Sequence, residues 1–114
     1  MILYGIKNCD TVRKARRWLE ANNVDFQFHD FRADGLDKET IDDWLKSVSW
    51  ETLLNKRSTS WKQLDDVRKE QLDQSIAIEL MLANPTLIKR PVFSDSSGCK
   101  VGFKEADYAA YFAK

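Results

Sequence analysis

The chain contains few of the residues that disulfide frameworks and zinc sites require, with 2 cysteines and 1 histidine among its 114 residues. Two cysteines as far apart in the sequence as Cys9 and Cys99 do not form the framework of a disulfide-rich domain. With a single histidine they cannot fill a four-ligand zinc site. We therefore expect no bound metal.

The sequence also lacks an excess of charge of either sign, since 18 Lys and Arg residues balance 18 Asp and Glu residues. This balance gives no support to bulk binding of nucleic acid or of anionic membranes. No apolar run approaches the length of a membrane span, and Met1 leads directly into a strand-like run rather than a signal peptide. We expect a cytoplasmic protein that binds neither nucleic acid nor membranes, and a monomer.

The first ten residues contain the most informative pattern. An apolar run typical of a buried strand ends at Gly5, and a helical pattern of apolar residues begins directly after Cys9. Cys9 is therefore predicted at a helix N-terminus, where unpaired N–H groups and the helix dipole favour a thiolate over a thiol. The alternative is a buried, inert cysteine that acts as a small apolar residue in a turn.

The order of the predicted elements indicates the fold class. Residues 24–29 alternate as a second strand, which should run parallel to the first after a right-handed crossover. Residues 91–94 and 100–103 are predicted as an antiparallel hairpin with a turn at 95–98, and an amphipathic helix follows. We predict an α/β, thioredoxin-like fold: a mixed four-stranded sheet in a single domain, residues 1–114, with a helical insertion at about 37–87.

The insertion is predicted to contain helices and no strand. Thr59 or Ser60 can cap a helix whose apolar residues include Trp61, Leu64 and Val67. Residues 76–82 form a denser apolar helix that should be the best buried of the group. In the last helix, the alanines Ala106, Ala109 and Ala110 and the aromatic Phe112 are available for packing.

Cys9 has no partner cysteine at the spacing of a thioredoxin motif, because Val12 occupies that position. A catalytic Cys9 would act as a monothiol and would need an outside thiol to release it from a mixed disulfide. Thr11 could donate a hydrogen bond to the sulfur or help to cap the helix. Cys99, beside Gly98 in the predicted turn, is expected to be an exposed, incidental thiol, and a resolving role stays open.

Two arginines are candidates for binding an anion. Arg57 lies where the helical pattern of the insertion breaks, and Arg90 precedes Pro91 at the entry to the third strand. In a thioredoxin-like fold this proline loop faces the N-terminus of the first helix, and the Arg90–Pro91 bond is predicted to be cis. A guanidinium there could stabilise the Cys9 thiolate and hold a carboxylate or oxyanion. The alternative for each arginine is a solvated surface charge.

Three segments resemble one family. Tyr4-Gly5-Ile6-Lys7-Asn8-Cys9-Asp10-Thr11, Leu53-Leu54-Asn55-Lys56-Arg57 and Leu87-Ile88-Lys89-Arg90-Pro91-Val92 are similar to the glutaredoxin-dependent arsenate reductase (ArsC/Spx) family. Within it the chain most resembles the YffB-like subgroup, regarded as glutathione-dependent thiol reductases. The resemblance extends over essentially the whole chain in the same order.

This resemblance implies a thiol–disulfide reductase with Cys9 as its catalytic thiol and glutathione as co-substrate, with no bound cofactor. Asn8, Thr11, Arg57, Arg90 and Pro91 match the positions that would bind glutathione or substrate, and glutaredoxin is a further candidate partner. One departure concerns a third arginine of the arsenate reductases, where this chain has Gly102-Phe103. Its loss removes charge-assisted hydrogen bonds of roughly 1.5–3 kcal/mol each. Arsenate reduction and a non-catalytic adaptor role of the Spx type are the alternatives.

Overall fold

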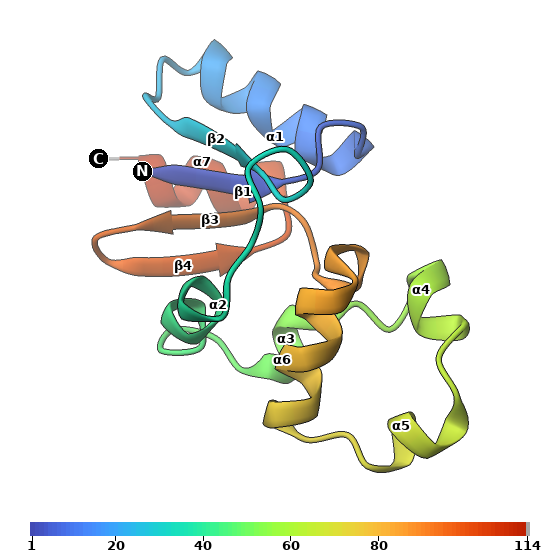
Figure 1. The fold of residues 1–114 in the computed structure, drawn as a ribbon. Helices are drawn as coiled ribbons and strands as arrows, with labels where there is room; N and C mark the ends of the chain where they lie inside the picture. The colour runs from blue at the N-terminus through green and yellow to red at the C-terminus, as the bar shows by residue number, and fades with distance from the viewer. Residues whose placement is uncertain (114) are drawn as a thin grey trace.

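The computed structural model describes residues 1–113 and contains a four-stranded mixed sheet with helices on both faces (Figure 1). The strands occur in the order β2-β1-β3-β4 across the sheet, with β1 and β2 parallel and β3 antiparallel to both β1 and β4. The strands are β1 (Ile2–Gly5), β2 (Gln27–Asp30), β3 (Val92–Asp95) and β4 (Gly98–Val101). The predicted thioredoxin-like α/β fold and the parallel first pair are confirmed.

Seven α-helices and one short 3-10 helix are present among the described residues. They are α1 (Asp10–Ala21), α2 (Lys38–Trp44), α3 (Trp50–Leu53), α4 (Thr59–Lys62), α5 (Asp66–Glu70), α6 (Gln74–Ala83), η1 (Pro85–Leu87) and α7 (Glu105–Phe112). Helices α1 and α7 lie behind the sheet in Figure 1, and α2 lies in front of it beside β4.

The alternation of side chains along the strands divides the core between the two faces of the sheet. Leu3 and Phe93 pack with Leu19 of α1 and Tyr108 of α7 on one face. On the other face, Val92 belongs to a cluster that includes residues of all the longer helices of the insertion. The insertion and one face of the sheet therefore share one apolar cluster.

Glycine at position 5 allows α1 to approach the end of β1 closely. A Cβ atom at this position would lie 2.7 Å from Cγ2 of Val12 in the first turn of α1. Gly5 and Val12 are both buried. This contact fixes where α1 begins relative to the sheet, and so fixes the position of Cys9.

The insertion differs from the prediction in its middle part. Instead of one helix capped by Thr59 or Ser60, Ser58 caps α4 and Asp65 caps the separate helix α5. Asp65 interrupts the helix because its side chain accepts the N–H of Arg68. Val67, one of the apolar residues of the predicted helix, is 61% exposed. The best-buried helix is indeed α6, with Leu80 and Met81 in the core.

Three boundaries and one packing face also differ from the prediction. Residues 24–26 are outside β2, and β3 and β4 occupy 92–95 and 98–101, so the turn is shorter than expected.

In α7 the three alanines are exposed, and Tyr108 is the buried residue. Aromatic contacts with Phe93 and Trp18 favour burial of Tyr108, because an alanine offers far less apolar area.

Candidate functional site

Cys9 is the N-cap residue of α1. Its N–H donates to the carbonyl of Ile6 at 3.1 Å, and its own carbonyl accepts the N–H of Arg13 at 2.9 Å. The chain therefore turns tightly after β1 and enters the helix at Asp10. Half-burial leaves the sulfur partly accessible, as a nucleophile requires.

The surroundings of Cys9 favour the thiolate. Partial burial raises the pKa of the Cys9 thiol, but the N–H groups of Val12 and Thr11 and the guanidinium of Arg90 outweigh it and hold the pKa below its ordinary value. The thiol makes no capping hydrogen bond of conventional geometry to the first turn of α1. Hydrogen bonding to the ionised sulfur from the Val12 N–H and from Arg90, followed by the charge of Arg90, stabilises the thiolate.

Arg90 lies beside Cys9 because of the sheet topology. Tyr4 pairs with Val92, so the residues just before β3 lie next to the end of β1, from which the chain turns to Cys9. The Arg90–Pro91 peptide bond is cis, as predicted. Arg90 is half-buried, and among the described residues its Nε has no hydrogen-bond partner. This buried N–H is a donor that the described part of the chain leaves unpaired.

Thr86 holds the Arg90 guanidinium in place, which the sequence prediction missed. Nη1 of Arg90 donates to the carbonyl of Thr86 at 3.1 Å, and the Thr86 hydroxyl is hydrogen-bonded to Ser60. Pro85 at the start of η1, five residues before Arg90, is the signal in the sequence that a helical turn begins here.

The segment that contains Arg57 lies beside the segment that contains Arg90. The structure does not place the Arg57 side chain on Cys9. Backbone hydrogen bonds join Asn55 N–H to Leu87 carbonyl at 2.6 Å and Lys89 N–H to Leu53 carbonyl at 2.8 Å. The Arg57 side chain is exposed and makes no hydrogen bond or ion pair within residues 1–113.

Asn8 and Thr11 flank the thiol and are both exposed. The carbonyl of Asn8 accepts a long hydrogen bond, 3.5 Å, from Nη2 of Arg13. Thr11 acts on the sulfur through its backbone N–H. The neighbouring Asp10 forms an ion pair with Arg13, so its charge opposes the thiolate less than an unpaired carboxylate would.

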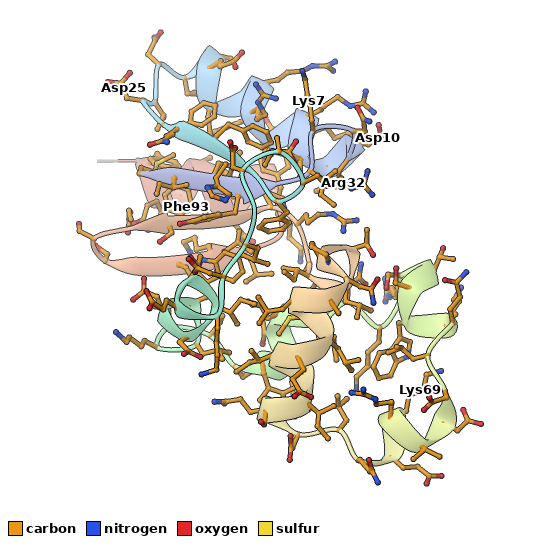
Figure 2. All side chains as sticks on the ribbon, in the orientation of Figure 1. Lys7, Asp10, Asp25, Arg32, Lys69 and Phe93 are labelled. Carbon is orange, nitrogen blue, oxygen red and sulfur yellow. The ribbon has the colours of Figure 1, made fainter. Side chains whose placement is uncertain are left out.

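Asp30 stabilises the loop that precedes Cys9, a role that the sequence prediction missed. One of its carboxylate oxygens accepts the N–H of Lys7 at 3.2 Å, and the other accepts the N–H of Arg32 at 2.8 Å. Burial raises the pKa of the Asp30 carboxyl, but these N–H groups dominate and lower it. Lys7, Asp10 and Arg32 surround the N-terminal end of α1 in Figure 2.

Cys99 differs from the prediction of an exposed thiol in a turn. It lies within β4, is half-buried, and its Sγ contacts the carbonyl of Trp44 at 3.5 Å. Burial raises the pKa of the Cys99 thiol, a hydrogen bond with Ser47 lowers it in part, and the charge of Asp43 adds a smaller upward effect. The pKa values of the two thiols are therefore shifted in opposite directions, downward for Cys9 and upward for Cys99.

Within residues 1–113, no group of three or more His, Cys, Asp or Glu residues is arranged to hold a metal ion. Over the same residues, no helix is long and apolar enough to cross a membrane.

Comparison with known proteins gives matches over nearly the whole chain. An uncharacterized protein of Haemophilus influenzae is 45% identical over 111 residues, which cover 97% of each chain. The global transcriptional regulator Spx of Streptococcus pyogenes is 32% identical over 114 residues, covering 98% of this chain and 84% of Spx.

Solved structures give the same result. The structure of the protein YFFB (PA3664) has a TM-score of 0.93 and 47% identity, and covers 98% of both chains. An arsenate reductase (ArsC) related protein from Brucella melitensis has a TM-score of 0.79 and 49% identity, covering 99% of this chain and 94% of that one. The model of the ArsC family, which includes reductases, matches residues 4–111. The chain therefore belongs to the ArsC family.

Proposed function

We propose that the protein is a monothiol, glutathione-dependent thiol–disulfide reductase. The observation that supports this function best is the site of Cys9: an accessible sulfur at a helix N-terminus, with the Arg90 guanidinium beside it. A thiolate is the reactive form in disulfide exchange, and this site favours it.

The reaction has two exchange steps. The substrate is a mixed disulfide between glutathione and a substrate thiol, and the Cys9 thiolate attacks its glutathione sulfur. A Cys9–glutathione disulfide forms. The substrate leaves as a thiolate, which takes a proton from water. A second glutathione then loses its thiol proton and attacks this disulfide, which releases oxidised glutathione and regenerates the Cys9 thiolate. Over the two steps one free glutathione thiol is consumed, the disulfide bond passes from the substrate to oxidised glutathione, and the substrate thiol is restored.

Glutathione offers carboxylates to the charged groups around Cys9. A carboxylate can pair with the Arg90 guanidinium, whose Nε has no other partner within residues 1–113. Arg57 is the second candidate, because its side chain is exposed and its segment is hydrogen-bonded to the segment that leads to Arg90. Asn8, Thr11 and Pro91 supply polar and shape contacts beside the sulfur.

The test is to incubate the reduced protein with oxidised glutathione and to map the adduct by mass spectrometry. We expect one glutathionyl group, on Cys9, which is removed by added glutathione. Cys9→Ser should abolish the adduct and Cys99→Ser should leave it unchanged. A modification found mainly on Cys99, or none at all, would contradict the proposal.

Arsenate reduction is a second candidate, favoured by the unpartnered Nε of Arg90 beside the thiol. Gly102-Phe103 supplies no third guanidinium, so we expect arsenate to perturb Cys9 far less than glutathione does. Turnover of arsenate by the unmodified protein with glutathione and glutaredoxin would establish this second activity.

A non-catalytic adaptor role, as in the regulator Spx, predicts instead an ordinary or raised pKa for the Cys9 thiol.

A further inference from the structure

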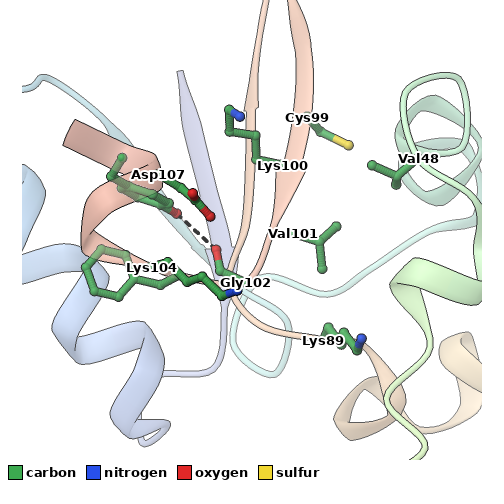
Figure 3. Close-up of a pocket in the computed structure, with 10 residues that line it drawn as sticks. Val48, Lys89, Cys99, Lys100, Val101, Gly102, Lys104 and Asp107 are labelled. Carbon is green, nitrogen blue, oxygen red and sulfur yellow. Dashed lines mark hydrogen bonds between the residues drawn. The ribbon is translucent and has the colours of Figure 1, made fainter. Parts of the chain in front are cut away.

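A second candidate site lies at the free edge of the sheet, away from Cys9. A hollow of about 610 Å³ opens beside β4, the edge strand. Its walls include Val48 and Val101 on one side and Phe103 and Tyr108 on the other. Figure 3 shows the Cys99 sulfur and Val48 on one side of β4, and Lys104 and Asp107 on the other.

The hydrogen bonds of the sheet leave part of the β4 backbone directed into this hollow. The N–H of Gly102 donates to the carbonyl of Pro91 at 2.8 Å. In an antiparallel ladder the bonded pairs alternate, so Lys100 bonds to Phe93, and the N–H and C=O groups of Cys99 and Val101 point away from β3. Among the described residues, no other backbone group pairs with these two N–H groups.

The two sides of the edge differ in character. Val101 faces the side of the insertion, where it packs against the core with Val48. Lys100 faces the side of α7, where its Nζ lies 5.0 Å from the centre of the Tyr111 ring. Lys104, at the N-cap of α7, is on that same side of the hollow, and Lys89 lies on its rim.

The charge around the hollow is mainly positive. Three lysines, at 89, 100 and 104, line it with one carboxylate, Asp107. Lysines at an exposed edge discourage pairing between two copies of the same strand, because two copies would bring like charges together. The same lysines attract a strand with negative side chains.

We propose that β4 is a docking site for an extended segment of a partner protein in which apolar and acidic residues alternate. The segment adds to the sheet by hydrogen bonds to Cys99 and Val101, in the manner of strand addition. Its side chains then alternate between the two faces. Apolar residues lie against Val48 and Val101, and acidic residues lie near Lys100 and Lys104.

The site is placed so that it can act together with Cys9. The ends of β1 and β4 lie at the same end of the sheet, separated by β3. Two strand spacings amount to about 10 Å. A partner bound along β4 therefore has its adjoining residues within reach of the thiol, although the docking itself requires no reaction of Cys9.

The test is a titration of the labelled protein, followed by amide resonances in NMR, with a short capped peptide of alternating valine and glutamate. We expect the largest shifts at Cys99, Val101 and Gly102, weaker binding in high salt, and no comparable shifts with a peptide of alternating valine and lysine. Shifts confined to other regions, equal shifts with both peptides, or shifts at β4 on raising the protein concentration alone would overturn the proposal. The last result would indicate self-association through β4.

Charge-reversal variants sharpen the test. Lys104→Glu should weaken binding of the glutamate peptide by about three- to tenfold, the effect of exchanging a modest exposed attraction for a repulsion. Lys89→Glu gives a second measurement if α7 does not tolerate the first change. Lys14→Glu, on the exposed face of α1, is the matched control and should leave binding unchanged. Equal weakening by all three variants would contradict a specific role of this edge.

Discussion

At the scale of single residues, one guanidinium distinguishes Cys9 from an ordinary helix-capping cysteine. Arg90 stabilises the thiolate directly, whereas the exposed Arg57 side chain makes no hydrogen bond or ion pair within residues 1–113. The two arginines lie in adjoining segments and carry the same charge. They therefore make a matched pair for testing how specific the electrostatic effect on the thiol is.

Replacing Arg90 by alanine should slow alkylation of Cys9 at neutral pH several-fold, because the thiolate fraction falls when the adjacent positive charge is lost. The rate is measured with a limiting reagent and mass spectrometry of the Cys9 peptide. Arg57→Ala is the control and should alkylate at the rate of the unchanged protein. Equal slowing by both variants would mean that the effect comes from the overall charge rather than from Arg90.

At the scale of elements, the approach of α1 to β1 positions the nucleophile. Gly5→Ala places a methyl group 2.7 Å from Cγ2 of Val12 and should destabilise the protein by about 1–3 kcal/mol, as overpacking does. Stability is measured by urea unfolding. In the double variant Gly5→Ala/Val12→Ala the clash disappears, so its loss of stability should be smaller than the sum of the two single losses. Additive losses would show that α1 does not rest on Gly5.

The N-cap of α6 offers a second test at this scale. The Asp73 side chain accepts the N–H of Ile76 at 2.9 Å, so Asp73→Ala should cost about 0.5–2 kcal/mol of unfolding free energy. Asp66→Ala, in the first turn of α5, removes an exposed carboxylate that does not cap its helix, and should change stability by less than about 0.5 kcal/mol. A smaller loss for Asp73→Ala than for Asp66→Ala would contradict the assigned cap.

The elements that the sequence predicted well are those with strong periodicity. The helical spacing after Cys9 and the dense apolar run of α6 gave the correct helices, and the parallel pair followed from the βαβ order. The predicted single helix after Ser58 was wrong because side-chain caps divide it, and apolar spacing alone does not reveal a cap such as Asp65. In α7 the predicted packing of Phe112 is confirmed, and that of the three alanines was wrong because alanines fit a buried or an exposed face equally well.

The sequence predicted those residues of the candidate site whose positions follow from local spacing or from the order of the strands. Cys9 follows from local spacing, and Arg90 from the fold that the strand order implied. The support from Thr86 and the hollow beside β4 depend on contacts between segments distant in sequence, which no local pattern encodes. Cys99 was misplaced because the turn of the hairpin is shorter than its polar residues suggested.

At the scale of the whole molecule, the shared core predicts that the insertion and the sheet unfold together. Met81 of α6 is fully buried in the cluster that also contains Val92 of β3. Met81→Ala should cost about 2–5 kcal/mol, and it should raise hydrogen exchange in β3 as well as in α6. Val67→Ala, at a side chain that is 61% exposed, is the control and should change little. Faster exchange confined to the insertion would show that it unfolds independently.

The pH dependence of cysteine alkylation tests the central account most directly, since it separates an activated Cys9 from an inert one. With both cysteine peptides followed by mass spectrometry across a pH series, the midpoint of the rate for Cys9 should lie below the ordinary pKa of a thiol. The midpoint of the rate for Cys99 should lie above that pKa. A Cys9 profile that coincides with that of Cys99, or lies at higher pH, would contradict the assignment of Cys9 as the nucleophile.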